Sequence, residues 1–269
     1  MEILGYQFFQ NALVGCMLAS VACAIVGTYV VTRRLVFISG GVTHTAFGGV
    51  GLGMFLSIDP LVTAMFFAVA SALGVQWMGR YKMVREDSAI ALFWIVGMAL
   101  GVIFSFMTPG YSSQLSTYLF GNILTVTSSD IGLLATVALV LSIIGFCLRR
   151  TILSVAFDAE FAASRGIPVK IIESLMMVLT AVTIVAALRL IGVVLVISML
   201  TVPVMTSMLF SRNYNSIVLL SMPICFGASL MGLWLSYIAD IPSGATIVLC
   251  SVAIYAVCRC VTVERRATQ

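Results

Sequence analysis

The sequence predicts an all-α protein: a polytopic membrane helix bundle of about nine (eight to nine) transmembrane helices, forming one domain over residues 1–269. Apolar residues make up 61% of the chain and charged residues only 9%, and the mean hydropathy is +1.16. A soluble domain has about 45–50% apolar and about 25% charged residues. So few charges cannot cover a water-facing surface, which excludes a soluble enzyme, a disordered chain and a nucleic-acid-binding protein.

Nine apolar stretches each approach the ~20 residues that a helix needs to cross a membrane. A transmembrane β-barrel would instead show short segments of alternating polarity, and the sequence has none. The first stretch has no basic residues before it and no cleavage site of small residues, so we expect a retained helix rather than a signal peptide. The stretches are 7–31, 36–57, 60–79, 88–107, 130–148, 170–187, 190–211, 215–237 and 241–259.

The basic residues are segregated by loop, since 13 of the 14 follow odd-numbered stretches and only Arg189 follows an even one. Basic loops remain in the cytoplasm. We therefore expect a multi-pass protein of the cell (inner) membrane, with its N-terminus outside and its C-terminus in the cytoplasm. A miscount by one helix would mix the two loop classes, so the segregation also supports nine spans. The 13 residues are Arg33, Arg34, Arg80, Lys82, Arg85, Arg149, Arg150, Arg165, Lys170, Arg212, Arg259, Arg265 and Arg266.

Several kinds of catalytic chemistry are missing from the sequence. A phosphate-binding P-loop needs a lysine that follows glycine and precedes Ser or Thr, and neither Lys82 nor Lys170 meets that pattern. The chain has one histidine and few paired carboxylates, and its seven cysteines form no zinc-type pair, so we expect them to be small buried apolar residues. A transport function is therefore expected, rather than an enzyme.

The segment 37–53, FISGGVTHTAFGGVGLG, contains the only histidine, His44. If the chain is helical from Arg34, His44 lies about 15 Å inward, near the middle of a ~30 Å hydrocarbon core. Ionisable groups at this depth usually face a cavity, and imidazole is a common metal ligand. The alternative is a packed histidine that is hydrogen-bonded to a neighbour. One imidazole cannot form a tight zinc site, but two copies facing each other across a dimer axis could form a weak transit site.

The same segment is rich in glycine, which lowers the stability of a helix by roughly 0.8–1.0 kcal/mol per residue relative to alanine. Two interpretations remain open. The glycines allow either close helix packing or a broken or closely approached helix that lines a path. They are Gly40, Gly41, Gly48, Gly49, Gly51 and Gly53.

The segment 157–170, FDAEFAASRGIPVK, is the longest charged segment on the expected inner side. It predicts a short amphipathic helix that stops at Gly166. The segment is either a solvated loop or a docking element for a cytoplasmic partner. On the expected outer side, Asp130 precedes an apolar run and is a candidate cap for the fifth helix.

Together these segments resemble the membrane permease of bacterial ABC importers for zinc, manganese and chelated iron. Arg33-Arg34-Leu35, leading to the helix of His44, is similar to the second-helix motif of that family. The segments 119–130 and 157–168 are similar to its mid-chain segment and its coupling loop. Residues 191–207, IGVVLVISMLTVPVMTS, are similar to its gated helix with a central proline, here Pro203.

The resemblance implies a permease of the vitamin-B12/metal type that works as a homodimer. It implies that two copies of a separate cytoplasmic ATPase bind ATP and dock on the coupling segment, where Asp158, Glu160 and Gly166 carry the coupling. A metal-binding protein outside the cell would deliver the ion. His44 is the candidate metal ligand, with Gly40, Gly41 and Pro203 on the pathway or gate. No covalently bound cofactor is expected, only the transported divalent metal.

The sequence departs from the family pattern around His44. The position four residues before the histidine usually holds Asp and is Gly40 here, and the usual proline after it is Gly48. Arg189 stands where the family more often has an uncharged polar residue. Because carboxylates suit manganese and imidazole suits zinc, zinc is favoured as the ion, followed by manganese or iron. Two other classes remain open: a secondary transporter or channel that uses His44 as a relay, and a structural membrane subunit without a pathway.

Overall fold

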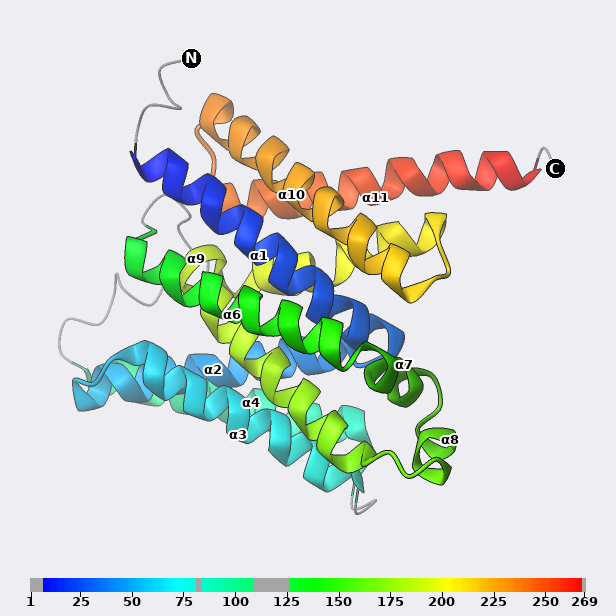
Figure 1. The fold of residues 1–269 in the computed structure, drawn as a ribbon. Helices are drawn as coiled ribbons and strands as arrows, with labels where there is room; N and C mark the ends of the chain where they lie inside the picture. The colour runs from blue at the N-terminus through cyan, green and yellow to red at the C-terminus, as the bar shows by residue number, and fades with distance from the viewer. Residues whose placement is uncertain (1–6, 81–83, 109–125, 268–269) are drawn as a thin grey trace.

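The protein is described by a computed structural model that covers residues 7–80, 84–108 and 126–267. Every regular element in these ranges is an α-helix (Figure 1). The helices are α1 (Gln7–Thr32), α2 (Val36–Leu56), α3 (Pro60–Arg80), α4 (Glu86–Met107), α6 (Ser128–Cys147), α7 (Arg149–Phe157), α8 (Ala159–Ser164), α9 (Val169–Phe210), α10 (Tyr214–Ala239) and α11 (Ser243–Ala267). The all-α prediction is confirmed, and the long helices follow the nine apolar stretches closely.

In the described residues, eight helical segments are long and apolar enough to cross a membrane, with α9 contributing two of them. They belong to α1, α3, α4, α6, α9, α10 and α11. Helix α2 has 21 residues and the required length, but it is not one of these eight segments. Most of its residues are buried among other helices, so its surface does not need to match lipid.

Helix α9 is the central element, and it contacts α1, α2, α3, α6, α10 and α11. It consists of two helical halves that meet at a kink at Gly192, whose φ of 75° and ψ of 167° are not helical. Only glycine adopts such a conformation readily. The break separates Val169–Leu188 from Ile191–Phe210, the two spans that the sequence predicts as 170–187 and 190–211. Helix α9 therefore reverses direction inside the bundle, and its first and last residues lie at the same end of the molecule (Figure 1).

Local signals set the helix ends at the opposite end of the bundle. The Asp59 carboxylate accepts a hydrogen bond from the backbone N–H of Leu61 at 2.9 Å, directly before Pro60 begins α3. Thr127 is the N-cap of α6, and Asp130 accepts from the Thr127 backbone N–H to complete a capping box. The prediction that Asp130 itself caps this helix is therefore wrong by three residues, although its carboxylate does stabilise the helix start.

The glycines of α2 serve close packing. A Cβ on Gly48 would lie 2.5 Å from the carbonyl oxygen of Gly97 on α4, and one on Gly51 would lie 2.6 Å from that of Gly101. On another face, a Cβ on Gly49 would lie 2.5 Å from the carbonyl oxygen of Thr63 on α3. Helix α2 is continuous from Val36 to Leu56. The helix is therefore not broken in this segment and its glycines serve close packing, whereas a role of α2 in lining a path stays a prediction.

We expect Gly48→Ala to destabilise the bundle by about 1–3 kcal/mol, because the backbones of α2 and α4 must separate to admit the methyl group. The measurement is the midpoint of unfolding in detergent. The matched control is Gly227→Ala in α10, where a Cβ would meet nothing within 4 Å. An equal effect of the two substitutions would contradict close packing at Gly48.

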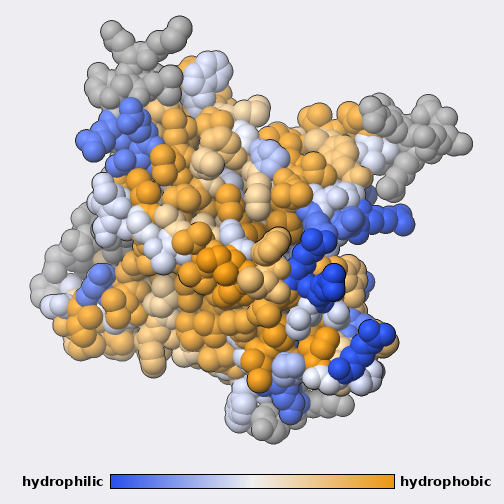
Figure 2. All heavy atoms as spheres, viewed as in Figure 1, coloured by the Kyte–Doolittle hydropathy of each residue, from blue (hydrophilic) through white to orange (hydrophobic). Residues whose placement is uncertain are grey.

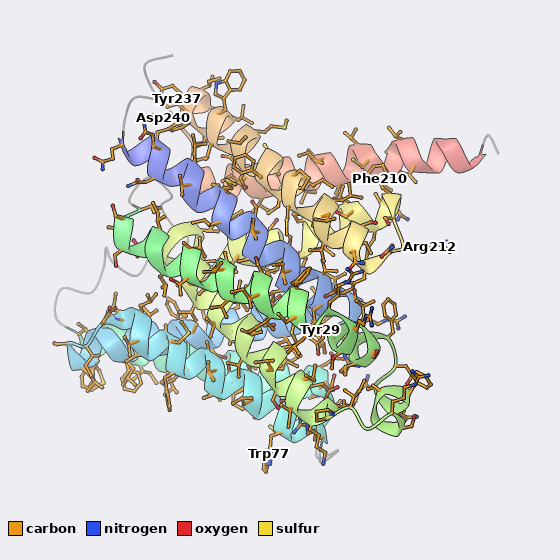
Figure 3. The ribbon with its side chains drawn as sticks, viewed as in Figure 1. Tyr29, Trp77, Phe210, Arg212, Tyr237 and Asp240 are labelled. Atoms are coloured by element: carbon orange, nitrogen blue, oxygen red, sulfur yellow. The ribbon has the colours of Figure 1, made fainter. Side chains whose placement is uncertain are left out.

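The surface divides into a wide apolar band and polar ends. Figure 2 shows apolar side chains across the middle of the visible face and hydrophilic ones gathered mainly at the right-hand end. That end carries the ends of α1, α3 and α6 and the starts of α7 and α10, where the predicted inner loops begin. Figure 3 labels Arg212 there and Asp240 at the far end of α10. Lys82, the side chain of Arg189 and those of Arg265 and Arg266 lie outside the described residues.

Candidate functional site

His44 lies eight residues after the start of α2 at Val36, or about 12 Å along the helix. Arg34 precedes the helix with a φ of 60°, so the expectation of a helix running from Arg34 is wrong by two residues. The imidazole is partly buried and stacks on the indole of Trp94 in α4, with ring centroids 4.3 Å apart and planes 11° from parallel. His44 therefore lies within the span of α2, at the contact between α2 and α4.

The stack is held in register by a polar contact on the next residue. Thr45 Oγ1 lies 2.7 Å from the Gly41 carbonyl oxygen in its own helix and 3.0 Å from the Phe93 carbonyl oxygen on α4. A hydroxyl that reaches a neighbouring helix fixes the relative height of the two helices inside a membrane. Phe93 and Trp94 are consecutive, so this contact places the indole opposite the imidazole.

Gly40 and Gly41 lie about one helical turn before His44, where α2 packs against α4 and α9. A Cβ on Gly40 would lie 3.4 Å from Trp94 Cζ3 and 3.9 Å from Ile197 Cδ1 in the second half of α9. A Cβ on Gly41 would lie 2.6 Å from Ile90 Cγ2 on α4. Three helices, α2, α4 and α9, therefore meet within one turn of His44, and the indole lies over the position where a side chain of residue 40 would begin.

The histidine has the chemistry of a ligand. Its Nδ1 is buried and has no hydrogen-bond partner among the described residues. An unpartnered buried nitrogen is costly, and a metal ion is one of the partners that neutral imidazole accepts. No group of three or more His, Cys, Asp or Glu side chains that could hold a metal occurs in the described residues. This chain alone therefore provides one nitrogen at this point, and not a complete coordination shell.

Pro203 lies in the second half of α9 and is buried. Proline has no N–H, so the Met199 carbonyl oxygen four residues earlier loses its helical partner. The thiol of Cys225 on α10 lies 4.0 Å from that oxygen and partly replaces the lost bond. Six residues separate Pro203 from Ile197, about 9 Å along the helix, so Pro203 lies on the same element as the His44 site but further toward the arginine-rich end.

The second candidate site is the segment of α7 and α8, which projects from the arginine-rich end of the bundle (Figure 1). Asp158 is the N-cap of α8, and its Oδ1 accepts a hydrogen bond from the Phe161 backbone N–H at 2.9 Å. At the other end, the backbone N–H of Ile167 bonds to the Ala162 oxygen and that of Gly166 to the Ala163 oxygen. These two bonds form a Schellman motif, with Gly166 in the left-handed conformation at φ 77°.

The outer surface of this segment presents side chains that have few internal partners. Phe157 and Phe161 are 65% and 52% exposed, and Glu160 lies between them, also exposed. Ala162 is fully buried and anchors the helix. Exposed aromatic side chains beside charged ones on a water-facing surface are typical of a protein-binding surface. The short helix predicted for 157–170 is present, and it ends as expected before Gly166.

Two arginines form contacts near this segment that no pattern in the sequence predicts: Arg33 joins α7 to the bundle, and Arg80 joins α3 to the start of α9. Arg33 at the end of α1 donates to the Val155 carbonyl oxygen of α7 at 3.2 Å and pairs with Glu173 of α9. Arg80 at the end of α3 donates to the Lys170 carbonyl oxygen at 2.8 Å and to Ser174. A displacement of α7 would therefore act directly on α1 and, through Arg33, on the first half of α9, which Arg80 in turn joins to α3.

Trp94 was also missed. Trp94 lies 50 positions after His44, within an apolar stretch whose neighbouring residues are also apolar. No local signal in the sequence therefore connects the two residues. The segment 119–125, which contributed to the resemblance, lies outside the described residues.

Comparison with known proteins agrees with this architecture. The ABC 3 transport family matches residues 5–262. A probable metal transport system membrane protein of Chlamydia pneumoniae is 38% identical over 86% of this chain and 81% of its own length. The manganese transport system membrane protein MntC of Halalkalibacterium halodurans is 30% identical over 95% of this chain and 87% of its own length. The solved structure of PsaBC from Streptococcus pneumoniae in complex with Fab superposes with a TM-score of 0.86 at 26% identity, covering 96% and 92% of the two chains.

A bundle of membrane-spanning helices around a broken central helix, with a helical segment projecting from one end, defines a multi-pass membrane transport subunit. The chain belongs to the ABC 3 transport family. The resemblance drawn from the sequence to ABC permeases is confirmed by the family match and by the superposition.

Proposed function

We propose that this chain is the permease subunit of an ATP-driven importer that carries a divalent metal ion, preferentially zinc, into the cytoplasm. The single observation that carries the proposal is the buried, unpartnered Nδ1 of His44 in α2, a helix enclosed within the membrane bundle. Intramembrane ionisable residues are rare and usually mark a transport path. The relatives named for metal or manganese transport support the class of cargo.

The choice of zinc rests on the ligands near His44. Helix α2 and the second half of α9 contain no Asp or Glu. Helix α4 has acidic residues only in its first turn, and Asp87 lies about 10 Å along the axis from Trp94. Manganese prefers carboxylate oxygen, whereas imidazole nitrogen suits zinc. Since one chain supplies one imidazole, we propose that a second copy of the chain supplies another, across the axis of a homodimer.

The charged end supports the proposed orientation in the membrane and the proposed energy source. Basic loops remain on the cytoplasmic side, so the arginine-rich end with α7 and α8 is placed in the cytoplasm, with the N-terminus outside and the C-terminus inside. There the exposed face of Phe157, Glu160 and Phe161 can bind a separate ATPase. ATP would act by changing the affinity of the ATPase dimer for two conformations of the permease. A metal-binding protein would deliver the ion at the opposite end.

The test is metal uptake into proteoliposomes that contain the chain and its partner ATPase. We expect zinc uptake that requires ATP on the side of the membrane where the ATPase is bound. This uptake should continue when a protonophore is added. Uptake without the ATPase, or uptake abolished by the protonophore at constant ATP, would establish a secondary transporter instead. Stronger competition by manganese than by zinc would overturn the choice of ion and leave the class of transporter intact.

Selectivity can be tested at Gly40, one helical turn before His44. We expect Gly40→Asp to shift the zinc-to-manganese uptake ratio toward manganese by about an order of magnitude, because a carboxylate oxygen then joins the imidazole. Its side chain must displace the Trp94 ring, which lies 3.4 Å from the Cβ position. Gly40→Asn has the same size without the charge and is the matched control. Equal ratios in the two variants would show that the carboxylate does not reach the ion.

A further inference from the structure

A cavity of about 350 Å³ opens between α1, α6, α7, α9 and α10. Its walls are apolar, formed by side chains such as Ile25, Leu141, Met176 and Met222. The volume is at the lower end of the range for small-molecule sites. The cavity does not include His44 or the α8 surface, so the proposed transport function does not account for it.

Apart from Ser142, whose hydroxyl donates to the Ala138 carbonyl oxygen of its own helix, the polar residues of this cavity lie at one end. Arg149 is the first residue of α7, and Tyr214 and Asn215 begin α10. The side chain of Arg149 is exposed and makes no hydrogen bond or ion pair within the described part of the chain. Arg212, two residues before Tyr214, is also exposed at this end (Figure 3). None of the residues that line the cavity is acidic, so its mouth carries an uncompensated positive charge.

From this charged mouth the cavity extends toward the middle of the bundle. Along α10 its lining runs from Tyr214 to Met222, about 12 Å of helix. The arginine lies at the level where helices α6 and α10 leave the apolar band, whereas Met222 lies within that band. A molecule that fills the cavity therefore needs an anionic group at the membrane surface and an apolar chain in the hydrocarbon region.

We propose that this cavity is a binding site for an anionic phospholipid, with its phosphate on Arg149 and part of one acyl chain between α6 and α10. Basic pockets between transmembrane helices on the cytoplasmic side are suited to anionic headgroups. Tyr214 and Asn215 can donate hydrogen bonds to phosphate oxygens. The acyl chain would replace the more mobile annular lipid along an apolar wall, and the arginine would select the headgroup.

The test uses the full chain in nanodiscs of phosphatidylcholine alone or of an equimolar mixture with phosphatidylglycerol. Lipids that remain bound after extraction are identified by native mass spectrometry. We expect phosphatidylglycerol to be retained in preference to phosphatidylcholine. Arg149→Gln should lower that preference about fivefold. Arg150→Gln is the matched control, because Arg150 is adjacent and exposed but does not line the cavity.

A second variant tests the cavity independently of charge. A Cβ on Gly145 would have ordinary van der Waals contact with Ile25 at 3.5 Å, so a larger side chain can enter the cavity without disrupting the fold. Gly145→Leu should therefore reduce retention of both lipids. Equal retention of the two lipids by the unaltered chain, or retention unaffected by both Arg149→Gln and Gly145→Leu, overturns the proposal. If Gly145→Leu instead lowers the dimer fraction with lipid retention unchanged, a second copy occupies the cavity and the lipid site is wrong.

Discussion

Replacing His44 with phenylalanine should reduce metal uptake by at least about 100-fold. The substitution keeps an aromatic ring that can stack on Trp94, where the imidazole now lies 4.3 Å from the indole. It removes both ring nitrogens, including the buried Nδ1 that has no partner. Even residues that only support a metal ligand change affinity or activity by about 10–100-fold, so the loss of a ligand should be at least that large. The measurement is the initial rate of zinc uptake in proteoliposomes with the partner ATPase.

The control for this substitution is Trp94→Phe, which preserves an aromatic partner for His44 and retains the nitrogens. We expect it to reduce uptake much less than His44→Phe. The amount of protein in the membrane and the unfolding midpoint should be similar in the two variants. Uptake by His44→Phe within about twofold of the unaltered chain, a difference of less than ~0.5 kcal/mol, would remove His44 from the transport path.

The second large effect is expected at Gly166, which ends α8 with a φ of 77°. Gly166→Val should lower the rate of ATP hydrolysis coupled to transport by about 5- to 30-fold. A side chain in the left-handed conformation costs about 1–2 kcal/mol, and this strain would be relieved by opening the end of α8. A Cβ at Gly166 meets nothing within 4 Å, so the bundle itself should remain folded and inserted. The measurement compares metal-stimulated ATPase activity with metal uptake in the reconstituted complex.

Gly166→Asn provides the conservative variant, since asparagine is tolerated in the left-handed conformation at helix C-termini. It should retain most of the coupling. If Gly166→Val and Gly166→Asn change the ratio of ATP hydrolysis to metal uptake equally, the conformation at the end of α8 does not transmit the coupling.

A matching pair of substitutions tests the other end of α8. Asp158→Ala removes the cap that accepts the Phe161 N–H, whereas Asp158→Asn can retain it.

The contacts of Arg33 and Arg80 give this coupling a structural route. Arg33 joins the Val155 carbonyl of α7 to Glu173 of α9, and Arg80 joins α3 to the first turn of α9. A force on α8 would thus reach both the helix that leads to α2 and the broken helix at the centre. The break at Gly192 allows the two halves of α9 to change their relative angle without breaking a regular hydrogen-bond ladder.

Much of the architecture was predictable because a membrane imposes simple rules on a chain. Helix number and position follow from the length of apolar stretches, since a backbone in lipid must bond to itself. The gathering of basic residues at one end follows from their segregation among loops. The α8 helix and its end at Gly166 follow from local residue types, because caps and glycine termini act within a few residues.

Other features were hidden from the sequence because they depend on residues far apart in the chain. The glycines of α2 could signal either a break or close packing, and only the approach of Gly97 and Thr63 on neighbouring helices decided for packing. In the same way, no pattern connects Trp94 with His44, Arg33 with Glu173, or Arg149 with Tyr214. Apolar stretches, charge segregation and capping residues act locally and can be recognised in the amino-acid sequence. Stacking, ion pairing and cavity formation depend on how helices pack, and therefore required the three-dimensional structure.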